Sequence, residues 1–178
     1  MATKLRRTGL SLCTVICAMQ PILASGQTAA YRPGETIQLA PEMRLRVITG
    51  SLDVFRNVTL IGVGRVFELQ FENPPGRFPV LEPSQEPGNS GVILQVGDSR
   101  VSPKALAYAK GSEHEVIMVD RLARNRENGR GAWFGFATQS NLQLLFDVPR
   151  EIADRPMRLL AEILLDGKAP PLRIEVVK

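Results

Sequence analysis

The stretch Leu142-Gln143-Leu144-Leu145-Phe146-Asp147-Val148-Pro149 carries the clearest structural signal in the chain. Apolar side chains occupy every second position from Leu142 to Val148, and Gln143, Leu145 and Asp147 stand between them. Successive side chains of a strand point to opposite faces of a sheet, so this alternation predicts a strand with one face on a core and the other toward water. Phe146 is therefore expected on the buried face and Gln143 on the solvent face.

The same period of two recurs on both sides of this stretch. It is clear from Phe67 to Glu72, where aromatic and Leu residues alternate with Glu and Gln. Weaker examples bring the expected total to eight or nine strands: Met43 to Ile48, Val58 to Val63, Val92 to Val96, His114 to Val119, Ala132 to Ala137, Met157 to Leu165 and Leu172 to Val177. The one helix candidate, Ile152 to Ala161, has Pro156 in its middle, which argues against a helix.

Turn-forming clusters separate these segments. Examples are Asn73-Pro74-Pro75-Gly76, Gly97-Asp98-Ser99 and Asp166-Gly167. Many short strands with regular turns predict an all-β fold, an antiparallel sandwich or barrel. Residues 73–91 form the longest irregular piece and contain five prolines, so Pro74 and Pro75 are candidates for a functional, partner-binding loop.

The first 26 residues are typical of a cleavable signal peptide. Lys4, Arg6 and Arg7 precede an apolar stretch from Leu10 to Ala24, and small residues follow at Ala24-Ser25-Gly26. Cleavage before Gln27 is expected, with a cut after Ala30 as the alternative, and both the general secretory and the twin-arginine routes stay open. The predicted organisation is a signal peptide at 1–26, a flexible leader at 27–36 and one β-sandwich domain at 37–178, located in the periplasm or secreted.

Removing the signal peptide changes the composition of the chain. Both cysteines, Cys13 and Cys17, leave with it, so the mature domain contains no disulfide. Taking Lys4, Arg6 and Arg7 from the 22 basic residues leaves 19 against 18 acidic ones, a formal charge of +1. A domain of this charge is a poor nucleic-acid binder, and contact with a membrane is expected only through the signal peptide or a weak surface attraction.

Three segments together resemble a telokin-like, immunoglobulin-like domain of exported bacterial proteins. Leu142 to Pro149, followed by a polar linker and Met157 to Leu165, is similar to the closing strands of that family, in which Phe-x-Val-Pro ends a strand. Phe67 to Asn73 is similar to an earlier strand, and Leu94 to Pro103 to the middle hairpin. The resemblance implies an immunoglobulin-like sandwich of about 43–177, a non-enzymatic role and no cofactor. The proline segment 73–91 departs from the family pattern.

Two motifs suggest catalysis but lack the required companions. Pro87-Gly88-Asn89-Ser90-Gly91 resembles a serine-protease nucleophile loop, yet that chemistry needs a preceding histidine to take the Ser90 proton. The only histidine, His114, comes later, and we interpret it as a solvent-side strand residue. One histidine without cysteine does not make a transition-metal site unless carboxylates converge on it.

The segment 121–133 is the most basic part of the chain after the signal peptide. It contains Arg121, Arg124, Arg126 and Arg130 against one acid, and it ends at Trp133. Like charges this close repel one another, and an acidic protein partner or an anionic envelope surface would compensate them. We define these four arginines as the arginine hairpin, and they are the leading candidates for partner binding.

The sequence therefore favours an exported, non-catalytic β-sandwich that binds a protein partner in the cell envelope, as an accessory or chaperone-like factor. Two alternatives stay open. A carrier of a small molecule or lipid needs a cavity between the sheets, and a hydrolase needs a pair of carboxylates at close range. The carboxylates available for such a pair are Glu68, Glu72, Asp98 and Glu113.

Overall fold

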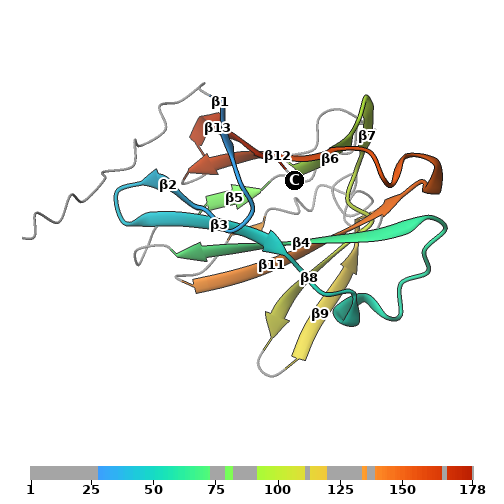
Figure 1. Cartoon of the computed structure of the whole chain (residues 1–178). Helices are drawn as coiled ribbons and strands as arrows, with labels where there is room; N and C mark the ends of the chain where they lie inside the picture. Colours follow the sequence, from blue (N-terminus) through green and yellow to red (C-terminus); the bar gives the residue numbers. More distant parts are fainter. Residues whose placement is uncertain are drawn as a thin grey trace, which may run out of the picture.

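The computed structural model describes residues 28–72, 79–81, 92–110, 113–119, 134–135, 139–165 and 168–177. These residues contain thirteen strand segments in two sheets, which lie as two layers (Figure 1). The expected all-β sandwich is therefore confirmed. No helix among the described residues is long and apolar enough to cross a membrane.

One sheet is antiparallel throughout its described part and has β4 and β11 at its centre. Its strands, in spatial order, are β2 (Thr36–Ala40), β3 (Met43–Thr49), β4 (Val63–Glu72), β11 (Gln139–Val148), β8 (Ala105–Lys110) and β9 (Glu113–Met118). The pairing of β4 with β11 is the longest, running from Val63 opposite Val148 to Glu72 opposite Gln139.

The second sheet is organised around β12. Its strands are β1 (Thr28–Tyr31), β13 (Lys168–Val177), β12 (Met157–Leu165), β5 (Pro79–Leu81), β10 (Phe134–Gly135), β6 (Val92–Val96) and β7 (Ser99–Val101). β12 pairs antiparallel with β13, with β6 and with β5. β1 pairs parallel with β13, so the first and last described strands lie side by side.

The main core fills the space between the two sheets. Phe146 of β11 is fully buried there, and its ring meets that of Phe67 edge to face at 6.0 Å between centroids. The other large side chains that are fully buried in this core are Phe71, Ile37, Leu39, Met43, Leu45, Leu69, Leu94, Leu142, Leu159 and Ile163. The predicted buried face of the Leu142 to Val148 strand is thus confirmed.

A second, smaller cluster lies on the opposite face of the β4–β11 sheet. The short 3₁₀ turn η1 (Leu52–Phe55) places Phe55 over Leu145, Val66 and the alanines of β8. This overturns the prediction that Leu145 faces water. Gln143, also expected on the solvent face, is only 9% exposed, and its Oε1 has no hydrogen-bond partner among the described residues.

Several predicted strands match the structure, and others do not. Val92–Val96 and Met157–Leu165 have the predicted bounds. Residues 58–62, in contrast, form no strand, because the chain there turns across the sheet before β4 begins at Val63. β1 lies inside the expected flexible leader, where pairing with β13 orders a segment that has no apolar period. The sequence did not predict β2, β5 and β8, whereas β6 and β7 form the hairpin that the resemblance implied for Leu94 to Pro103.

Candidate functional site

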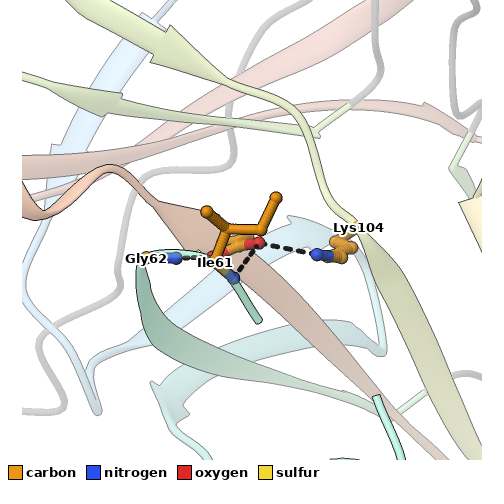
Figure 2. Close-up of polar contacts among 4 residues, drawn as sticks. Ile61, Gly62 and Lys104 are labelled. Atoms are coloured by element: carbon orange, nitrogen blue, oxygen red, sulfur yellow. Dashed lines mark hydrogen bonds and ion pairs between the residues drawn. The ribbon is translucent and has the colours of Figure 1, made fainter. Parts of the chain in front are cut away.

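Asp147, near the end of β11, holds the loop that connects η1 to β4. Its Oδ1 accepts a hydrogen bond from the backbone nitrogen of Gly62 at 2.8 Å, and its Oδ2 accepts one from that of Ile61 at 3.0 Å. Lys104, just before β8, donates from Nζ to Oδ2 at 2.6 Å (Figure 2). We call these four residues the Asp147 clamp. It joins three segments that are distant in the sequence.

The local sequence is suited to this close approach. At Gly62 a Cβ atom would overlap the carbonyl oxygen of Val148, so a side chain there would push the loop off the strand. At Gly64 a Cβ atom would come within 2.7 Å of methyl carbons of Leu52 and Leu60, which pack over the β4 backbone. The two glycines therefore let the loop lie directly on the sheet.

The surroundings of Asp147 favour its charged form. Burial tends to raise the pKa of the carboxyl group, but the hydrogen bonds from Lys104, Ile61 and Gly62 and the charge of Lys104 outweigh burial and lower it. The Asp147 side chain is 14% exposed and that of Lys104 26%, so the pair is partly shielded from water and salt. The clamp acts as a structural ion pair at neutral pH.

The clamp presents an apolar residue to solvent. Ile61 is 83% exposed, the highest value among the exposed large apolar residues of the described chain. Leu52, in η1 at the other end of the same loop, is 46% exposed. We call Leu52 and Ile61, with the loop between them, the apolar loop. An exposed isoleucine on a backbone held by two hydrogen bonds is preorganised for contact.

A surface pocket of about 190 Å³ opens beside this loop. It lies at the end of the sandwich, where β3 leaves the sheet and β12 begins. Its lining residues are Thr49, Gly50, Leu52, Gly64, Arg65, Val66, Phe67 and Met157. Arg65 is the one charged residue in this lining, and its Nη2 donates to the carbonyl oxygen of Ala153 at 3.0 Å.

The residues that the sequence favoured for partner binding lie outside the described part of the chain. This holds for Arg121, Arg124, Arg126 and Arg130 of the arginine hairpin and for Pro74 and Pro75, so their role stays a prediction. Ser90 and Trp133 also lie outside it. His114 is described and is exposed at the start of the edge strand β9, as the sequence interpretation expected.

The four carboxylates considered for a hydrolase are spread over three places in the two sheets. Glu68 and Glu72 are both on β4, where Glu68 accepts from Gln70 at 2.9 Å and Glu72 pairs with Arg44 at 3.7 Å. Asp98 is in the turn between β6 and β7, in the other sheet, and Glu113 begins β9. The described residues include no group of three or more His, Cys, Asp or Glu that could hold a metal ion.

Sequence reasoning missed both the clamp and the apolar loop. The sequence predicts a strand at 58–63, although Gly62 lies inside this run and Gly64 follows it. Two glycines spaced by one residue at the start of a strand indicate a close backbone approach, and this was the available signal.

Comparisons with known proteins identify no relative. No family model matches the chain, and neither the curated proteins nor the solved structures contain a match.

Proposed function

We propose that the protein is an exported, non-catalytic, immunoglobulin-like β-sandwich that works by binding a protein partner in the cell envelope. The apolar loop is the described surface that supports this proposal best. The arginine hairpin is proposed as a second contact, with an acidic partner or an anionic surface.

The strand order supports the immunoglobulin-like part of the proposal. In a constant-type immunoglobulin fold, strands A, B, E and D form one sheet, and G, F and C the other; variable-type domains add C′. Here β3, β4, β11 and β8 follow one another in one sheet, while β13, β12, β6 and β7 do so in the other. When these eight strands are lettered A, B, C, C′, D, E, F and G in chain order, the first sheet has the order A-B-E-D and the second the order G-F-C-C′. These are the orders of neighbours in the immunoglobulin fold.

The exposure of Ile61 is the observation that carries the binding proposal. Burying an isoleucine side chain typically contributes about 1.5 to 3 kcal/mol of favourable free energy. Ile61 does not make this contribution to the fold, so it is available to binding. The loop is also held in place by Asp147, so a partner that buries Ile61 does not have to order the backbone first. Interface residues that dominate affinity are commonly anchors of this kind, held rigidly and inserted into a pocket of the partner.

Affinity capture from the native envelope extract tests the proposal. We expect Ile61→Ser to reduce capture of the partner while leaving the fold intact, because the side chain makes little contact within the protein. Val177→Ser is the matched control, since Val177 is a moderately exposed apolar residue on the other sheet. Equal capture by both variants and the unchanged protein would contradict a role for the apolar loop.

A second pair of measurements tests the remaining parts. Reversal of Arg124 and Arg126 to Glu is expected to weaken capture most at low salt, where the Debye length is longer. Unchanged capture under these conditions would remove the arginine hairpin from the proposal. The intact mass of the exported product is expected to begin at Gln27, and a mass that still includes the first 24 residues would contradict cleavage.

A further inference from the structure

The pocket beside the apolar loop combines apolar side chains, Thr49 and two glycines with one cation. Leu52 comes from η1, Phe67 from β4 and Met157 from the first position of β12, so the pocket touches both sheets. Arg65 lies two residues before Phe67 on β4, and therefore on the same face as the inter-sheet core. The sequence thus places a guanidinium group at the open end of an otherwise apolar layer.

Arg65 has one shielded donor that the described protein does not satisfy. Its Nη2 donates to the carbonyl oxygen of Ala153, but its Nε is shielded from solvent and meets no acceptor among the described residues. None of the described carboxylates forms an ion pair with it. A shielded donor without an acceptor is costly, and a cationic one more so. No described carboxylate therefore balances the charge of Arg65, which lines the pocket.

We propose that this pocket binds a small organic carboxylate, with Arg65 receiving the carboxylate and Leu52, Phe67 and Met157 contacting its apolar body. This site goes beyond the protein-binding function proposed above. It does not depend on the apolar loop having a partner.

The chemistry of the pocket selects a carboxylate rather than a phosphate. The planar guanidinium fork matches a carboxylate, and one positive charge balances one negative charge. A phosphate dianion would bring a second charge that no described lining residue compensates, which is unfavourable beside apolar walls. The volume of about 190 Å³ is above the roughly 150 Å³ of a cavity that accepts benzene and below the usual range for drug-sized ligands. The ligand is therefore compact.

Nuclear magnetic resonance of the Arg65 Nε–H group in the intact mature protein tests the proposal. We expect isobutyrate to produce a saturable shift of this resonance. Isobutyramide, which has the same shape but no charge, should bind at least about tenfold more weakly, because a hydrogen bond to a charged group contributes about 1.5 to 3 kcal/mol. Inorganic phosphate should also bind more weakly than isobutyrate.

Two arginine variants separate binding from a general salt effect. Arg65→Met keeps an unbranched side chain but removes every donor, and we expect it to abolish isobutyrate binding. Arg100→Met, at an exposed position on β7, should leave binding unchanged. Equal affinities for isobutyrate and isobutyramide, tighter binding of phosphate, or an equal shift of the Arg100 Nε–H resonance would overturn the proposal. The comparison of ligands uses the unmodified protein, so it decides the matter even if Arg65→Met does not fold.

Discussion

Gly62 and Asp147 are 85 residues apart in the sequence, yet the backbone nitrogen of Gly62 donates to Asp147 Oδ1 at 2.8 Å. Together with the Ile61 nitrogen and Lys104 Nζ, it makes one carboxylate the point where three segments meet. The position of the apolar loop therefore depends on the charge of Asp147 and on the absence of a side chain at Gly62.

Replacing Asp147 with Asn should lower the free energy of unfolding by about 1 to 3 kcal/mol at neutral pH. The reason is that Lys104 and the two backbone nitrogens lose their charged acceptor in a partly shielded place. The pKa of Asp147 is lowered in the folded protein from its ordinary value of 3.8. The carboxylate therefore stabilises the fold above pH 3.8, and this contribution is lost as the pH falls through the lower, folded pKa. Urea denaturation at a series of pH values measures it.

The difference between the unchanged protein and Asp147→Asn should shrink as the medium becomes acid. Glu151→Gln, at an exposed position in the 3₁₀ turn η2 (Arg150–Ile152), is the control and should change stability little at neutral pH. A difference for Asp147→Asn that stays constant down to the lowest pH would contradict the role of the charge.

Gly62→Ala should cost about 3 kcal/mol or more, because the added Cβ atom overlaps the carbonyl oxygen of Val148 and the backbone must move. Gly34→Ala provides the comparison. Gly34 has a positive φ of 88° but open space around it, so its alanine variant should cost only the backbone strain of about 1 to 2 kcal/mol. Chemical denaturation of both variants checks this order, and the reverse order would mean that the loop does not lie on Val148.

Phe146→Ala should lower the free energy of unfolding by about 3 to 5 kcal/mol, since the ring is fully buried against Phe67. Asn141→Ala, at an exposed position on the same strand, should change it by less than about 0.5 kcal/mol. Guanidinium denaturation of the two variants gives both values. Similar effects would show that β11 is out of register with its neighbours.

Gln143→Leu should raise the free energy of unfolding by about 1 kcal/mol. The substitution removes a shielded carbonyl oxygen that has no partner among the described residues, and it keeps a side chain of similar size. The cost is the 3.5 Å contact from Gln143 Nε2 to Glu68, which is long for a hydrogen bond. Thermal unfolding measures the change. A loss of stability would show that the Gln143 amide makes hydrogen bonds that stabilise the fold.

The long strands were predictable because their alternation is local. β12 occupies the predicted residues, and β11 contains the whole of the predicted Leu142 to Val148 strand, since every second side chain has to reach the core. The strand β1 could not be predicted in this way. It is ordered by backbone pairing with β13, which leaves no apolar period in the sequence.

The Asp147 clamp was hidden for a different reason. Asp147 sits at a position that the alternation assigns to solvent, and nothing near it in the sequence indicates a partner. Its partners come from the loop before β4 and from Lys104, 43 residues away. A contact of this kind depends on which loop covers the sheet, and the strand pattern does not specify that.

The residues around Phe146 by themselves determined a strand and its buried face, because side-chain direction along a strand has a period of two whatever the strand packs against. The repetition of that period, with turns between the segments, determined the all-β fold. The tertiary structure alone decided what covers the other face. η1 and the loop after it fold across the outside of the β4–β11 sheet and bury Leu145, while Lys104, just before β8, forms the ion pair with Asp147. The same arrangement leaves Ile61 in solvent. The hydrogen bond from its backbone nitrogen to Asp147 holds the loop, so the Ile61 side chain does not have to be buried for that purpose.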